Sequence, residues 1–182
     1  MKLFKSVVLP MLLAFGLSAA QAALDIGERA PDFTADAALG GKTFRYSLGE
    51  ALAKGPVVLY FFPAAFTEGC SIEAHEFAEA IDQYKALGAS VVGVSGDDLE
   101  LIGRFSAQVC QSRFPVVADD KRQVIKAFDA AMRKRPEYAD RVSYVIAPDG
   151  KVVYTYMSLN PHQHVERTLA AVQQWVKAQP GR

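Results

Sequence analysis

Residues 57–77 read VVLYFFPAAFTEGCSIEAHEF, and this stretch decides which fold the chain adopts. The run 57–62 is continuous, β-branched and aromatic, and prolines flank it, which predicts a strand buried on both faces of a sheet. From about Cys70 the apolar residues recur at helical spacing, which predicts an amphipathic helix over 70–87 that ends at Gly88. Its apolar positions are Phe77, Ile81, Tyr84 and Leu87. The strand therefore delivers Cys70 to the first turn of a helix.

A cysteine at the start of a helix has a chemical use. The helix dipole and the unpaired N–H groups of the first turn stabilise an anion, and the thiolate is the nucleophilic form of a thiol. Three residues earlier, Thr67 carries a hydroxyl that can reach those N–H groups, the thiolate or a bound oxygen substrate, or can act as a plain cap. Free cysteines are also common as small buried hydrophobes, so both interpretations of Cys70 stay open at this point.

The rest of the chain continues the alternation of strands and helices within one domain. The patterns predict strands over 90–95, 114–118, 142–146 and 151–156, and helices from the Asp97-Asp98 cap to Val109, over 121–130 and over 165–176. The segment Pro148-Asp149-Gly150 joins the last two strands as a hairpin turn. This order predicts an α/β fold of the thioredoxin-like type, with a central mixed β-sheet sandwiched by helices.

The first 22 residues have the pattern of a secretory signal peptide. Lys2 and Lys5 precede the apolar run 7–15, and residues 20–22 supply an A-x-A cleavage site. The run is shorter than the ~20 residues that a spanning helix needs, which argues against the alternative of a membrane anchor. We therefore expect cleavage after Ala22, a mature domain over 23–182, and a periplasmic or secreted protein.

Charge and ligand spacing exclude several classes of partner. Residues 1–22 hold two lysines and no acids, so the mature chain keeps 18 basic and 20 acidic residues, a formal charge of −2. Such a chain offers no electrostatic reason to bind nucleic acid or, once mature, an anionic membrane. No group of His and Cys residues has zinc-like spacing, so neither a metal nor another cofactor is expected.

The pattern Pro63-x-x-x-Thr67-x-x-Cys70, followed by Glu73, resembles the peroxidatic-cysteine signature of the peroxiredoxins of the AhpC/TSA type. The stretch FFPAAFTEGCSIEAHEF is most similar to the bacterioferritin-comigratory, or peroxiredoxin Q, branch. The opening IGERAPDFTA is also typical, so the resemblance runs from about Leu24 to the last helix. It implies a thiol-specific peroxidase that reduces hydrogen peroxide and organic hydroperoxides in antioxidant defence, without metal, haem or flavin.

The resemblance also implies roles for individual residues. Cys70 is the peroxidatic nucleophile, which attacks a hydroperoxide and becomes a sulfenic acid, and Thr67 is its hydrogen-bonding partner. Pro63 shields the site and its turn shapes the pocket. Arg141, just before the strand 142–146, holds the thiolate and polarises the peroxide, as a permanently charged planar cation can. Glu73 matches a position that pairs with arginine and has a supporting role.

The second cysteine leaves the resolving step open. Many proteins of this branch carry a resolving cysteine five residues after the nucleophile, where this chain has His75. Cys110, on the following helix, is a possible resolving thiol that would form a disulfide with Cys70. The alternative is that Cys110 is packed in the core and an external thiol reduces Cys70. We expect His75, and the pair His162 and His164, to face solvent without a function.

Two other functions fit this sequence less well than the peroxidase. A thioredoxin-like thiol-disulfide oxidoreductase needs a C-x-x-C pair, which this sequence lacks, and a proline directly before the strand 142–146, which is also absent. A non-catalytic periplasmic binding module would have no reason to keep Thr67, Cys70 and Arg141 together. The expected partners are a hydroperoxide substrate and a thioredoxin-like or other thiol reductant, with the protein a monomer or a homodimer.

Overall fold

The computed structural model describes residues 23–179. The predicted signal peptide falls on residues 1–22 and lies outside the described residues. Within residues 23–179, no helix is both long enough and apolar enough to cross a membrane. The elements are β1 (Thr34–Leu39), β2 (Lys42–Ser47), α1 (Leu48–Leu52), β3 (Val57–Phe61), α2 (Glu68–Ala86), β4 (Ser90–Ser95), α3 (Leu99–Gln108), β5 (Val116–Ala118), α4 (Gln123–Ala127), β6 (Val142–Ile146), β7 (Val152–Met157), the 3-10 helix η1 (Pro161–Gln163) and α5 (His164–Lys177).

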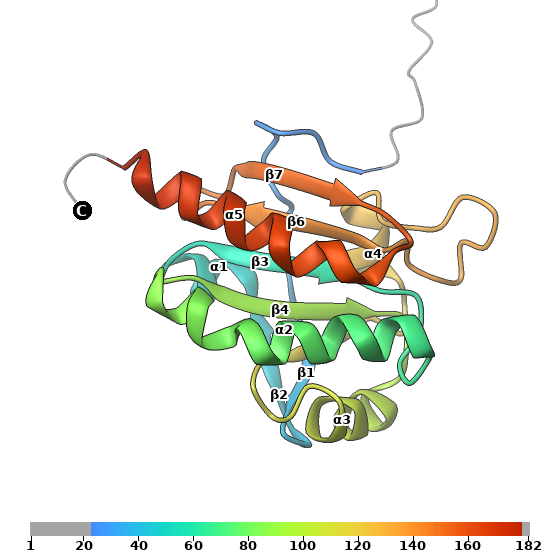
Figure 1. The fold of residues 1–182 in the computed structure, drawn as a ribbon. Helices are drawn as coiled ribbons and strands as arrows, with labels where there is room; N and C mark the ends of the chain where they lie inside the picture. The colour runs from blue at the N-terminus through green and yellow to red at the C-terminus, as the bar shows by residue number, and fades with distance from the viewer. Residues whose placement is uncertain (1–22, 180–182) are drawn as a thin grey trace, which may run out of the picture.

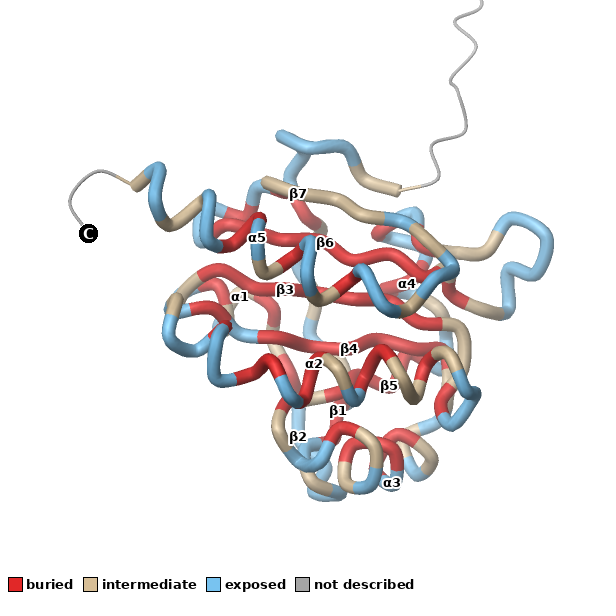
Figure 2. The backbone as a smooth tube through the Cα atoms, in the orientation of Figure 1, coloured by how far each residue is buried: buried red, intermediate tan, exposed pale blue. Residues whose placement is uncertain are grey.

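The strands form one mixed sheet in the order β2-β1-β5-β4-β3-β6-β7, with helices on both faces (Figure 1). At its centre β3 runs parallel to β4 and antiparallel to β6, and every residue of β3 is fully buried. Figure 2 shows β3, β4 and β6 as the buried middle of the molecule. This is the thioredoxin-like arrangement that the order of elements predicts, and the strand and helix around Cys70 lie where the sequence indicates.

The alternation of side chains along β3 divides the interior into two cores. Val58 and Tyr60 pack on the side of α2, α3 and α5, whereas Val57, Leu59 and Phe61 pack on the side of α1 and α4. A strand that is apolar at every position is therefore explained by helices on both faces of the sheet.

The N-terminal hairpin is the largest feature that the sequence patterns do not predict. β1 and β2 pair in antiparallel register through a turn at Gly40 and Gly41, both with positive φ, and β1 joins the sheet beside β5. Most residues of β2 are exposed, so the hairpin lacks the apolar run that marks β3. The dipeptide Gly-Gly between two short β-prone runs is the signal that can find it.

Gly93 of β4 leaves the space that the ring of Tyr60 fills. The two residues are paired in register, and a Cβ at Gly93 would lie 2.9 Å from both Cζ and Oη of Tyr60. Tyr60 is fully buried and stacks on Phe77 with 4.4 Å between ring centroids, so it has little room to move. We expect Gly93→Ala to lower the free energy of unfolding by about 2 kcal/mol, measured by urea denaturation.

A glycine in the neighbouring helix α3 supplies the control for that substitution. The nearest atom to a Cβ at Gly103 is 3.8 Å away, an ordinary contact, and alanine is favoured over glycine inside a helix by ~1 kcal/mol. Gly103→Ala should therefore leave stability unchanged or raise it. Equal stability of the two variants would contradict the steric role of Gly93.

Candidate active site

The turn between β3 and α2 holds Cys70 at the end of the central strand. The backbone N–H of Ala65 donates to Asp97 Oδ2 at 2.7 Å, which ties this turn to the loop after β4. Phe66 adopts a positive φ of 62°, and the chain then enters α2 at Glu68. Cys70 lies in the first turn of α2 with a side chain that is 1% exposed. The thiol is therefore held at a helix start but almost entirely covered.

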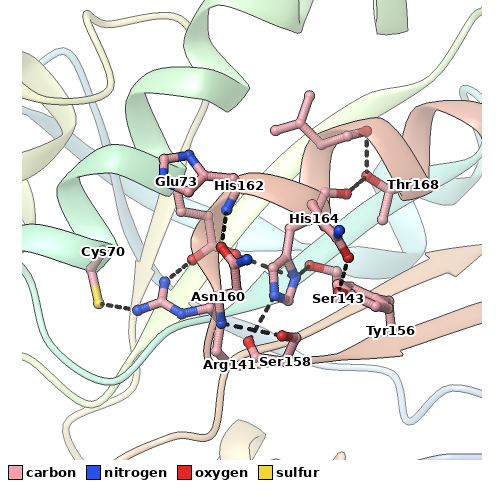
Figure 3. A network of polar contacts seen from close by, with 12 residues as sticks. Cys70, Glu73, Arg141, Ser143, Tyr156, Ser158, Asn160, His162, His164 and Thr168 are labelled. Atoms are coloured by element: carbon pink, nitrogen blue, oxygen red, sulfur yellow. Dashed lines mark hydrogen bonds and ion pairs between the residues drawn. The ribbon is translucent and has the colours of Figure 1, made fainter.

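Arg141 reaches this thiol from the neighbouring strand. Val142 of β6 pairs with Phe61 of β3, so Arg141 lies beside the turn that carries Cys70. Its Nη2 donates to Cys70 Sγ at 3.4 Å, and its Nη1 donates to Glu73 Oε2 (Figure 3). The residue is 5% exposed, because the end of the sheet and α2 enclose it. One guanidinium therefore bridges a thiol and a carboxyl in the protein interior.

The electrostatic environment keeps this arginine charged. Burial alone would lower the pKa of Arg141, but the nearby Glu73 and Cys70 raise it above its usual value. The same Nη1 also donates to the carbonyl oxygen of Gly69 at 3.4 Å. A cation in this position can stabilise a thiolate at Cys70 and negative charge that develops beside it.

Glu73 is buried, not a surface acid of the first turn. Its side chain is 0% exposed, and burial raises its pKa to about 8, although Arg141 acts in the opposite direction. Its second oxygen, Oε1, lies 3.4 Å from His164 Nδ1. The carboxyl thus connects the guanidinium to a histidine of α5.

Thr67 and Pro63 lie on the turn itself. The hydroxyl of Thr67 donates to the carbonyl oxygen of Ala64 at 2.9 Å and makes no capping bond to α2. The single hydroxyl hydrogen therefore points away from Cys70, while the oxygen lone pairs remain as acceptors. Pro63 is partly buried and lies two positions after the last residue of β3. The roles that the resemblance implies for these two residues stay predictions.

The prediction that His164 faces solvent is wrong. His164 is fully buried as the first residue of α5, where its ring packs edge-on against Tyr156 with 4.8 Å between centroids. The ring contacts Ser143 Oγ through Nδ1 at 2.8 Å and the carbonyl oxygen of Ser158 through Nε2 at 3.0 Å. These contacts give both ring nitrogens of His164 a polar partner in the interior, whereas the sequence predicted a solvated position for it. Neither His164 nor Ser143 was predicted to lie near the site.

The other two histidines are exposed, as predicted. His162 Nδ1 lies 2.7 Å from Glu76 Oε1 on the surface of α2. His75 is half exposed, beside Glu79 at 3.3 Å and Gln111 at 2.9 Å. The polar contacts of both rings are to surface residues, and none of them is to Cys70.

Cys110 lies just after α3 and is completely buried. Both cysteines are free thiols, and both belong to the core on the α2 side of the sheet. Burial raises the pKa of Cys110 above its ordinary range, so this thiol stays protonated in the folded state. In the reduced state Cys110 is therefore packed in the core. Whether it resolves the oxidised Cys70 stays a prediction.

The fold and this geometry define a thioredoxin-fold protein in which one arginine contacts one cysteine at a helix start. Within residues 23–179, no group of three or more His, Cys, Asp and Glu side chains is arranged to hold a metal ion. The AhpC/TSA family matches residues 26–155, and the chain belongs to this family of peroxiredoxins.

Individual relatives of the chain are named as peroxiredoxins or a peroxidoxin. The chain is 34% identical over 119 residues to a chloroplastic peroxiredoxin Q of Triticum aestivum, covering 65% of this chain and 54% of that protein. It is 31% identical over 147 residues to a putative peroxiredoxin of Mycobacterium tuberculosis, covering 78% and 90%. The crystal structure of peroxidoxin BcpB from Mycobacterium tuberculosis superimposes with a TM-score of 0.70 at 28% identity, covering 82% and 96%. The chain spans 54% of the wheat protein and 66% of two rice relatives, less than two thirds of their length.

Proposed function

We propose that this protein is a thiol peroxidase that reduces hydrogen peroxide and organic hydroperoxides through Cys70. The observation that carries the proposal is the contact between Arg141 Nη2 and Cys70 Sγ at 3.4 Å, at the start of α2. The pairing with Glu73 accounts for one side of the buried guanidinium, and the contact of Nη2 with the thiol is the part that this pairing does not require. The charge of Arg141 can stabilise a thiolate and the oxygen that leaves when the O–O bond breaks.

The first chemical step is nucleophilic attack on the O–O bond. The Cys70 thiolate attacks the terminal oxygen of a hydroperoxide, the O–O bond breaks, and an alkoxide or hydroxide leaves and takes a proton from water. The products are a sulfenic acid at Cys70 and an alcohol or water. Arg141 lies against the attacking sulfur and can stabilise the charge that moves onto the leaving oxygen.

The second step returns the sulfenic acid to a thiol. A second thiol condenses with it, forming a disulfide and releasing water, and a thioredoxin-type dithiol then reduces that disulfide and becomes oxidised itself. The second thiol is Cys110 or an external one. Cys110 is 0% exposed and protonated, so condensation within the chain requires the first turn of α2 and the segment after α3 to open.

The proposal is tested by intact-mass measurement and peptide mapping after the reduced protein receives one equivalent of hydrogen peroxide. Loss of two hydrogens with a Cys70–Cys110 link would establish a two-cysteine peroxidase. Addition of one oxygen at Cys70 alone would establish a one-cysteine enzyme. An unmodified Cys70 would contradict the peroxidase proposal.

The variant Cys110→Ser separates the two steps. Because Cys110 makes no contact with Arg141, the first oxidation of Cys70 should keep its rate within about twofold, since side chains without shared partners act independently. If Cys110 resolves, the variant should accumulate sulfenic acid at Cys70 and lose turnover with a dithiol reductant. Turnover equal to that of the unaltered protein would assign resolution to an external thiol.

For location, we propose export to the periplasm with removal of residues 1–22. The basic start, the apolar run 7–15 and the A-x-A site support this proposal. The reductant would then be a thiol donor available in that compartment, and the protein would act as a monomer or homodimer. Cell fractionation with N-terminal sequencing tests this directly, because a mature protein that begins at residue 23 is expected, and an uncleaved cytoplasmic chain would overturn it.

A further inference from the structure

The surroundings of His164 determine that one ring nitrogen, Nε2, is protonated, but they leave the protonation of the other, Nδ1, open. Nε2 faces the carbonyl oxygen of Ser158 at 3.0 Å, and because a carbonyl only accepts, Nε2 must carry a hydrogen. Nδ1 faces two groups at once, Ser143 Oγ at 2.8 Å and Glu73 Oε1 at 3.4 Å. Figure 3 shows the ring of His164 lying between Glu73 and Ser143.

Glu73 Oε1 is a buried oxygen without a hydrogen-bond donor. The other carboxyl oxygen is paired with Arg141, whereas Oε1 has no hydrogen-bond partner in the described structure, although the whole side chain is 0% exposed. A buried acceptor that is left unsatisfied is costly, and an ionised one more so. A single proton on Oε1 or on His164 Nδ1 removes the problem. A protonated Nδ1 donates to Oε1, and a protonated Oε1 donates to the lone pair of Nδ1 when the hydroxyl of Ser143 turns its hydrogen away from that atom.

The charges around the site favour keeping that proton. With it, the guanidinium and a Cys70 thiolate balance each other, and the Glu73 and His164 pair is neutral. Without it, Glu73 is a bare carboxylate and the enclosed group carries a net charge of −1. A low-dielectric interior disfavours the second state. The bare carboxylate would also compete with the thiolate for the charge of Arg141.

We propose that Glu73 and His164 share one proton beneath Cys70, and that this proton leaves the charge of Arg141 free to act on the thiolate. His164 is thus a positioning residue that acts through Glu73 and Arg141. The expected effect on the rate of peroxide attack rests on the proposed peroxidase function. The existence of the shared proton does not depend on that function.

The directions of the pKa shifts agree with this arrangement. Burial raises the pKa of Glu73 to about 8 and lowers the pKa of His164 to about 4. The proton therefore resides on Glu73 Oε1 at neutral pH, with His164 Nδ1 as its acceptor. Because the protonated form is the favourable one, raising the pH through about 8 removes the proton, and the rate of peroxide attack should fall there.

Other titratable groups lie around Glu73 and His164, and the test must distinguish their titration from that of the shared proton. From α2, Glu76 raises the pKa of Glu73 and is itself paired with His162 of η1. From β7, Tyr156 packs on the ring of His164 and lies under the guanidinium of Arg167. None of these groups donates to Glu73 Oε1, so a substitution of His162 leaves the shared proton in place.

The kinetic experiment follows the rate constant for oxidation of Cys70 by hydrogen peroxide between pH 6.5 and pH 9.5. In the unaltered protein we expect the rate to fall above about pH 8. Glu73→Gln carries a permanent donor in place of the acid and should lose this fall. His164→Gln keeps a donor toward Ser158 but loses the acceptor Nδ1, so the fall should move about one pH unit lower, the equivalent of one hydrogen bond.

The control is His162→Gln, the same substitution two positions away on the surface, which should leave the pH of the fall unchanged. A fall that persists in Glu73→Gln, or that stays at the same pH in His164→Gln, would overturn the proposal. If His164→Gln does not fold, as judged by circular dichroism, Glu73→Gln alone still decides the question.

A spectroscopic readout keeps this inference separate from the peroxidase proposal. Infrared difference spectra at pH 7 between the unaltered protein and Glu73→Gln should contain the carbonyl band of a protonated carboxylic acid, and that band should shift in His164→Gln. Its presence without any oxidation of Cys70 by peroxide would refute the function and leave the shared proton standing. Oxidation of Cys70 without the band would refute only the shared proton.

Discussion

Cys70→Ser is expected to abolish the reduction of peroxide, with a loss of about four orders of magnitude or more in turnover, as when other enzymes lose their nucleophile. A serine hydroxyl does not ionise near neutral pH, so the variant offers no anionic nucleophile beside Arg141, whose Nη2 lies 3.4 Å from the sulfur of Cys70. The measurement is consumption of hydrogen peroxide in the presence of a dithiol reductant, at a pH near neutrality.

The substitution changes one atom in a well-packed position, so the fold should persist. Cys70 is 1% exposed, and a buried hydroxyl in place of a sulfur costs about 1–3 kcal/mol when it lacks a partner. Thermal unfolding of the variant shows whether the loss of activity has a structural cause. Full peroxidase activity in a folded Cys70→Ser protein would show that Cys70 is not the nucleophile.

The parts of the fold that sequence patterns predict are those with one strong periodicity. β3 is apolar at every position and α2 has an apolar stripe, so their type and limits follow from hydrophobicity alone. β1 and β2 have mostly exposed side chains, so pairing and not burial defines them. Their Gly-Gly turn is a local signal that carries less weight than a buried run.

The residues of the candidate site also differ in how far the sequence predicts them. The position of Cys70 follows from the strand and helix patterns around it, whereas the role of Arg141 and the pairing of Glu73 with an arginine came only from the family resemblance. The burial of Glu73 and the whole placement of His164 could not be predicted, because charged and polar residues near a helix start are ordinarily solvated. Their burial depends on one another and on Arg141, which is 68 positions from Glu73 in sequence. Such mutual compensation is visible only when the packed elements are seen together.

Arg141→Ala is expected to slow the oxidation of Cys70 by about 10²–10³-fold, the usual loss when one group that stabilises transition-state charge is removed. The guanidinium contacts the sulfur directly and is the only cation that donates to it among the described residues. The measurement is the rate of sulfenic acid formation at Cys70, followed by rapid quenching and intact mass.

The same variant should lose stability in a pH-dependent way. Burial raises the pKa of Glu73 to about 8 although Arg141 acts in the opposite direction, so removing Arg141 should raise this pKa further. A group with a raised folded-state pKa contributes stability at low pH that is lost as the pH rises toward the folded-state pKa. Below about pH 8 Glu73 is protonated in both folded proteins and this loss is the same, whereas above about pH 8 it ends in the unaltered protein and continues in the variant. The difference in urea unfolding between Arg141→Ala and the unaltered protein should therefore stay constant up to about pH 7 and widen above about pH 8.

Arg141→Lys is the matched control, because it keeps the charge and loses the planar fork. An ammonium is a point charge and cannot direct two fixed N–H groups at Cys70 Sγ and Glu73 Oε2 together. We expect it to remove most of the extra loss of stability above about pH 8 but to restore only part of the rate. If Arg141→Ala oxidises Cys70 at an unchanged rate, Arg141 has no place in the mechanism, and its burial serves Glu73 alone.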